Sequence, residues 1–108
     1  WRSRPRPMEP KTIDYQANAM LEFIREKEIG QKLRDLRQKF RWNETIFISS
    51  LKYLWDTGAI GACLMRTGSR GRKALVFYYK PYENYILVHS DAKIINTWNN
   101  IELLLKSS

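Results

Sequence analysis

The stretch FISSLKYLWDTGAI, residues 47–60, carries the most clearly marked helix of the chain together with its end. Phe47, Leu51 and Leu54 recur at steps of four and three residues, which is the spacing of an apolar helix face. Gly58 follows, and glycine readily adopts the left-handed conformation that commonly ends a helix. The pattern predicts a helix with one buried side and a sharp C-terminal stop.

The start of this helix is marked as well. Asn43 is a strong N-cap candidate, and Glu44 stands in the first turn, where the helix dipole favours a carboxylate. We therefore expect a helix over residues 43–57. The side opposite the apolar face offers hydroxyl groups and one cation for hydrogen bonding. Its candidate contact residues, with the cap, are Asn43, Thr45, Ser49, Lys52 and Tyr53.

Two more helices are predicted before it. Asp14 is a cap candidate for a helix that runs to about Lys27, and a second helix is expected over residues 29–40. The second helix and the residue after it are rich in cations that could contact phosphates, although a charged helix surface is often only a solvated one. The cations are Lys32, Arg34, Arg37, Lys39 and Arg41.

After the helices, the pattern changes to that of a β-hairpin. Residues 62–67 and 74–80 read as strands joined by a loop, residues 68–73, that contains glycine. The strand Leu75 to Tyr79 has no polar face, so both its sides should be covered. We expect the cover to come from residues 85–88 or from the last helix.

The last helix is expected from about Asp91 to Lys106. Its apolar residues repeat at steps of four, three and four, which is also the spacing of a coiled-coil seam. The four seam residues, and hence the candidate dimer interface, are Ile94, Trp98, Ile101 and Leu105.

Composition narrows the class of protein. The 108 residues carry a net charge of +8, and 44% are apolar, which favours one globular domain that attracts polyanions such as nucleic acid. Cys63 is the only cysteine and His89 the only histidine, so we expect no internal disulfide, no metal site and no cofactor. Residues 1–12, rich in proline and arginine, predict a flexible basic arm. Without a recognisable catalytic constellation the chain is not expected to be an enzyme.

Three short helices followed by a hairpin whose loop holds glycine and arginine resemble the winged helix-turn-helix domain of small archaeal and bacterial transcription regulators. The most specific part is the stretch at residues 47–60, and GRKALVFYY from Gly71 resembles the wing and its returning strand. The resemblance covers about residues 13–80. It implies an α+β winged helix-turn-helix fold with an additional C-terminal helix in an extension, residues 81–108. It also implies a recognition helix in the major groove and a wing on the backbone or minor groove. The wing residues expected to contact DNA are Ser69, Arg70, Arg72 and Lys73.

The resulting hypothesis is an intracellular, double-stranded DNA-binding transcription regulator that acts as a homodimer in the cytoplasm or nucleus, with no membrane association. Two alternatives stay open: a winged-helix module that binds protein, and a DNA-binding domain of a larger replication or recombination protein.

Ile48 and Trp55, on one flank of the helix at 43–57, are expected to be covered by another element or another chain.

Overall fold

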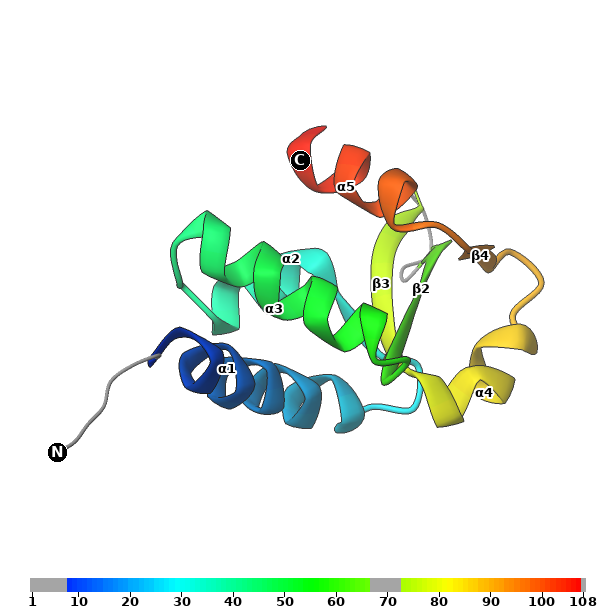
Figure 1. The fold of residues 1–108 in the computed structure, drawn as a ribbon. Helices are drawn as coiled ribbons and strands as arrows, with labels where there is room; N and C mark the ends of the chain where they lie inside the picture. The colour runs from blue at the N-terminus through cyan, green and yellow to red at the C-terminus, as the bar shows by residue number, and fades with distance from the viewer. Residues whose placement is uncertain (1–7, 67–72, 108) are drawn as a thin grey trace, which may run out of the picture.

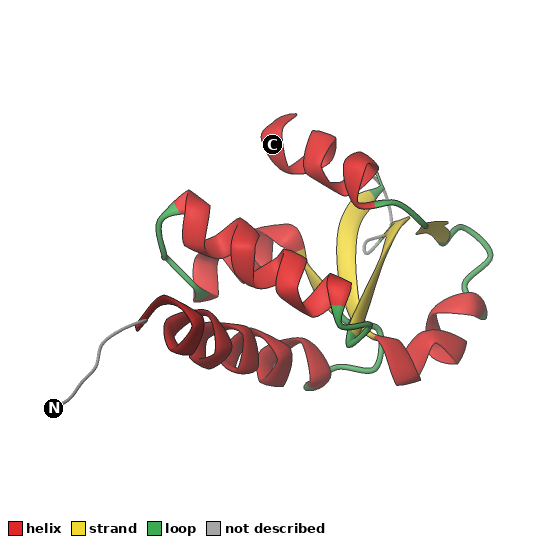
Figure 2. Cartoon of the chain, viewed as in Figure 1, coloured by secondary structure: helices red, strands yellow, loops and turns green. Residues whose placement is uncertain are grey.

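The structure, a computed structural model, describes residues 8–66 and 73–107, with side chains over 15–66 and 73–106. Helices and strands are mixed along the chain, so the fold is α+β (Figures 1 and 2). The elements are α1 (Met8–Arg25), β1 (Gln31–Lys32), α2 (Leu33–Lys39), α3 (Glu44–Asp56), β2 (Ile60–Met65), β3 (Ala74–Tyr79), the 3₁₀ turn η1 (Lys80–Tyr82), α4 (Glu83–Leu87), β4 (Lys93–Ile95) and α5 (Trp98–Ser107).

The described strands form one antiparallel sheet in the order β1-β3-β2-β4. Its centre is the predicted hairpin, β2 and β3, in which Ala62 lies opposite Phe77. The same Phe77 also lies opposite Gln31 of β1. Gly30, just before β1, has φ +82°, and a Cβ there would meet the backbone of Phe77. This glycine therefore lets the chain pass close to β3 on its way into α2.

One face of the sheet packs against α1, α2, α3 and α5. Leu75 and Phe77 of β3 lie in a core cluster with Leu36 from α2, Leu51 from α3 and Ile101 from α5. Figure 1 shows α3 lying between α1 and α5 on this side. The main core thus brings the three earlier helices and the last one onto the same face.

The other face is covered mainly by α4. Val76 and Tyr78 of β3, with Cys63 of β2, pack against Ile86 of α4, which is fully buried. Burial, together with donation of the Tyr78 hydroxyl to Glu83 Oε2 at 2.6 Å, raises the pKa of Tyr78. The prediction that β3 is covered on both sides is confirmed. Both segments expected to cover it do so: residues 85–88 contribute Ile86 on this face, and the last helix packs on the opposite face.

The first predicted helix boundary is wrong. Residues 8–12, assigned to a flexible arm, already belong to α1, and Asp14 lies inside the helix rather than capping it. Pro10 is compatible with this because the N–H groups of a helix's first turn have no partner within the helix, so a residue that lacks one is tolerated there. The remainder of the predicted arm, residues 1–7, lies outside the described residues.

Two other helices are shorter than predicted. Residues 31 and 32 form β1 instead of the start of the second helix, because they pair with β3. The last helix begins at Trp98 rather than near Asp91, and Ile94 lies in β4, paired with β2. The helix at 43–57 and the hairpin were predicted correctly within a residue or two.

Candidate nucleic-acid interface

The helix α3 is held at both ends by the residues that predicted it. Asn43 Oδ1 accepts a hydrogen bond from the backbone N–H of Ile46 at 2.9 Å. At the other end Gly58 adopts φ +77°. Phe47 and Leu51 are buried against the core. Asn43 therefore acts as the N-cap, and its side-chain oxygen is already used within the protein.

A strip of α3 faces away from the core. It contains Thr45 and Lys52, which are exposed, and Ser49, which is half-buried. Lys52 is paired with Asp56 at 2.9 Å, and its ammonium lies 5.8 Å from the Trp98 ring centre. The strip offers hydroxyl groups and a cation whose charge is already balanced. Tyr53, the remaining predicted contact residue, is 41% exposed beside this strip.

The flank of α3 next to the strip is covered by α5. Trp55 and Trp98 lie with their ring centres 6.3 Å apart, and Ile48 packs against the main core cluster. Ile48 and Trp55 are both half-buried, so the prediction that another element covers them is confirmed in part. Each of the two side chains keeps part of its surface exposed to solvent.

The basic residues in and beside α2, from Lys32 in β1 to Arg41 in the following loop, differ in their surroundings. Arg34, Lys39 and Arg41 are exposed and Lys32 is half-buried, and the described residues include no ion pair to any of these four. Lys39 lies 5.7 Å from the centre of the Phe23 ring. These cations remain accessible to an anionic partner.

Arg37, by contrast, uses both terminal nitrogens of its guanidinium within the protein, while its buried Nε has no hydrogen-bond partner among the described residues. It donates from Nη1 to Glu44 Oε1 at 2.6 Å and from Nη2 to Oε2 at 3.2 Å, and it reaches the backbone carbonyl of Leu105 at 3.4 Å. Its guanidinium lies 5.0 Å from the Phe47 ring centre. The hydrogen bonds from Arg37 lower the pKa of Glu44. Of the five predicted phosphate-contacting residues, Arg37 is the one that mainly joins α2, α3 and α5.

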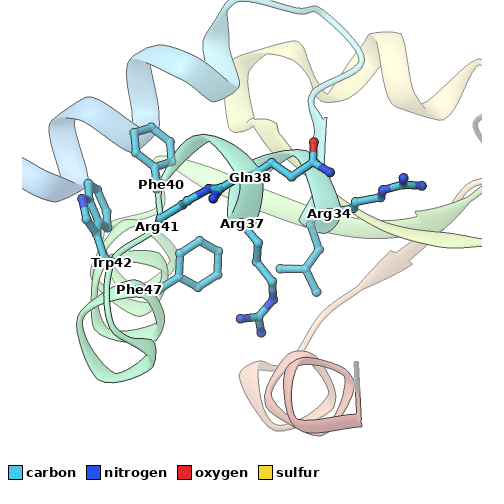
Figure 3. Close-up of a pocket in the computed structure, with 8 residues that line it drawn as sticks. Arg34, Arg37, Gln38, Phe40, Arg41, Trp42 and Phe47 are labelled. Atoms are coloured by element: carbon cyan, nitrogen blue, oxygen red, sulfur yellow. The ribbon is translucent and has the colours of Figure 1, made fainter.

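A groove of about 570 Å³ runs along α2 and the loop that leads to α3 (Figure 3). Figure 3 shows arginines leaving α2 in different directions, while Phe47 projects from α3 toward Arg37. Sequence reasoning identified the cations but missed the groove, because its shape depends on how the two helices pack. Its lining residues are Leu33, Arg34, Arg37, Gln38, Phe40, Arg41, Trp42 and Phe47.

The hairpin end carries further cations. Arg66, which follows β2, and Lys73, which precedes β3, are exposed. The backbone N–H of Arg66 donates to Asp91 Oδ2 at 2.9 Å, which lowers the pKa of Asp91. Arg66 was not among the predicted contact residues, although it is one of the basic residues of the same stretch. The other predicted wing residues, Ser69, Arg70 and Arg72, lie outside the described residues.

The predicted dimer seam is not an exposed stripe. Ile101 and Leu105 are buried in the core of the chain itself, and Trp98 packs at the edge of that core. Ile94 lies in β4 and packs on the opposite face of the sheet. The apolar spacing that suggested a partner helix is thus satisfied within one chain.

Comparison of the chain with protein-family models, with curated proteins and with solved structures finds no match. Over the residues that the structure describes, no helix has the length and apolar character needed to cross a membrane. Within the same residues, no cluster of three or more histidine, cysteine or acidic side chains could hold a metal ion.

Proposed function

We propose that this chain is a winged-helix domain that binds double-stranded DNA and serves as a transcription regulator rather than an enzyme. In this proposal α3 enters the major groove, and the hairpin end contacts the flanking backbone or minor groove. The order of three helices followed by a hairpin supports the fold assignment. Pairing of β1 with β3 supports it further, because it ties the link between α1 and α2 to the hairpin.

The observation that carries the proposal is the distribution of charge around α3. The exposed strip of α3 presents hydroxyls, while accessible cations lie before it, at Arg34 and Lys39 of α2 and at Arg41 of the loop between the two helices. More cations lie at the hairpin end after it, at Arg66 and Lys73. Phosphate contacts supply most of the affinity for duplex DNA, and groove contacts supply the sequence preference. The elements beside α3 would give affinity and α3 itself a modest preference.

The proposal includes a homodimer acting inside the cell, with half-sites about 34 Å apart, one turn of DNA. Because Ile101 and Leu105 are inside the core, the two copies must meet through other residues. Size-exclusion chromatography coupled to light scattering measures the oligomeric state directly. A monomer at all concentrations would leave DNA binding intact but would remove the paired half-sites.

The test of DNA binding is a titration with a random duplex at about 50 and about 200 mM salt, with a single-stranded competitor. We expect a salt slope that reports several phosphate contacts, and a preference for duplex. Replacing Arg70 and Arg72 together by alanine should lower that slope by about 2, one for each lost phosphate contact.

A matched control removes two cations from other surfaces. Lys27, in the turn after α1, and Lys93, in β4, are both exposed. The double variant Lys27→Ala with Lys93→Ala has the same net charge as the Arg70 and Arg72 variant. If both double variants weaken binding equally, DNA responds only to the net charge of the protein and not to the position of the two arginines. Absence of binding at both salt concentrations would contradict the proposal outright.

A further inference from the structure

The groove along α2 has an apolar floor that is fixed in place. Leu33 and Phe47, which form part of it, are 7% and 2% exposed and belong to the main core cluster. Phe40 lies between Phe23, at 5.6 Å, and Trp42, at 4.7 Å between ring centres. A floor built from core residues keeps its shape without a ligand, and its volume of about 570 Å³ falls in the usual range of binding pockets.

The rim of the groove is cationic. Arg34 and Arg41 are exposed, and neither forms an ion pair among the described residues. The described residues that line the groove include three arginines, Arg34, Arg37 and Arg41, and no acidic residue, and the charge of Arg37 is paired with Glu44. Guanidinium groups bind carboxylates and phosphates with two parallel hydrogen bonds. Charge complementarity therefore favours an anionic occupant.

The state of the aromatic rings decides between nucleic acid and protein. A single strand binds by stacking bases on open ring faces. In this groove the Arg37 guanidinium already lies over Phe47 at 5.0 Å, and Phe40 is packed against two other rings. The floor thus suits the packing of an aliphatic or aromatic side chain better than the stacking of a base. A duplex phosphate would reach the rim but leave the floor in contact with water.

We propose that this groove binds an acidic segment of a partner protein, in which an apolar side chain inserts between carboxylates. The apolar side chain packs on Leu33, Phe40 and Phe47, and the flanking carboxylates pair with Arg34 and Arg41. Tryptophan and arginine, both present here, are among the residue types that contribute most to protein interfaces. This binding activity goes beyond the proposed recognition of DNA by α3 and the hairpin end, and it shares Arg34 and Arg41 with the proposed contacts to the DNA backbone.

The test uses labelled synthetic peptides and the full chain, with binding followed by fluorescence anisotropy. One peptide alternates aspartate with phenylalanine or leucine, a second replaces the apolar residues by serine, and a third replaces aspartate by asparagine. We expect the first peptide to bind, and the other two to bind at least tenfold more weakly, because each lacks one of the two contributions.

Variants of the rim locate the site. Arg34→Ala with Arg41→Ala should weaken binding of the first peptide about tenfold, whereas the Lys27→Ala, Lys93→Ala control should change it less than twofold. Arg34→Lys with Arg41→Lys keeps the charge but loses the paired hydrogen bonds, so it should show an intermediate loss. All these side chains are exposed, and circular dichroism checks that each variant is folded.

Amide chemical shifts give a second readout that does not depend on substitution. With the first peptide, the largest changes should fall in residues 33–47. Equal binding of the serine-containing peptide, or shift changes centred elsewhere, would overturn the proposal. A single-stranded oligonucleotide that shifts the same amides and binds more tightly than the peptide would overturn it in favour of nucleic acid.

Discussion

Two neighbouring segments of this protein differ sharply in charge: residues 31–41, which comprise β1, α2 and the start of the following loop, and residues 44–57, which hold α3. Residues 31–41 have a net charge of +4, whereas residues 44–57 hold Glu44, Lys52 and Asp56 and have a net charge of −1. The single cation of α3 is paired with Asp56. In the proposed function, the helix that enters the groove therefore adds little electrostatic attraction. Most of the attraction comes from its neighbours, which separates affinity from sequence preference along the chain.

The largest expected effect is a loss of folding stability when a glycine at either end of these two segments is substituted. Gly30 precedes α2 and Gly58 follows α3, and both have positive φ. A Cβ at Gly30 would meet the backbone of Phe77 and Tyr78, which cannot move aside, whereas a Cβ at Gly58 has open space. Gly30→Ala should lower the free energy of unfolding by about 3 kcal/mol or more, and Gly58→Ala by about 1 kcal/mol.

Urea denaturation of the two variants measures this difference. The two substitutions are chemically identical and both occur at left-handed positions, so each is the control for the other. Equal losses of stability would show that the close approach of Gly30 to β3 is not what positions α2. A difference of the expected size would show that α2 is tied to the sheet more rigidly than the end of α3.

The next largest expected effect is a change in the salt slope of DNA binding when cations are removed from either segment. Arg34→Ala with Arg41→Ala removes two accessible cations from the +4 segment, so the salt slope for a random duplex should fall by about 2. Lys52→Ala removes a cation that is already paired, so it should change the slope by less than one unit. A larger effect of Lys52→Ala than of the double variant would reverse the comparison and make α3 the main source of affinity.

Local signals predicted α3 well, because its cap and its stop act on residues next to them. Asn43 satisfies an N–H three residues later, and Gly58 adopts its conformation without help from distant parts of the chain. The strand β1 could not be predicted in this way. It consists of Gln31 and Lys32, and it is a strand only because β3 lies beside it.

The candidate site was predicted in part for the same reason. The accessible cations in and beside α2 were recognisable as residue types, but the engagement of Arg37 by Glu44 and by the Leu105 carbonyl depends on three elements meeting. The spacing of Ile101 and Leu105 showed an apolar stripe correctly. Spacing does not distinguish a partner chain from the protein's own core, and here the core buries both.

The smallest expected effect is the coupling free energy of the ion pair between Arg37 and Glu44, the contact that joins the two segments. The pKa of Glu44 is lowered in the folded state, so the pair stabilises the fold above the unfolded-state pKa of about 4.3, and this contribution is lost as the pH falls through the folded-state value. Both side chains are partly exposed, which limits the coupling to about 1 kcal/mol or less at pH 7.

A double-mutant cycle of Arg37→Met, Glu44→Gln and the double variant, followed by thermal unfolding, isolates this coupling from the effect of Glu44 on the helix dipole. The coupling should be present at neutral pH and absent once Glu44 is protonated. If it were zero at neutral pH, α2 and α3 would be held together by Phe47 and the core alone. The charge of α2 could then be altered without disturbing α3, because no electrostatic link would connect the helix that attracts anions to the helix proposed to read the groove.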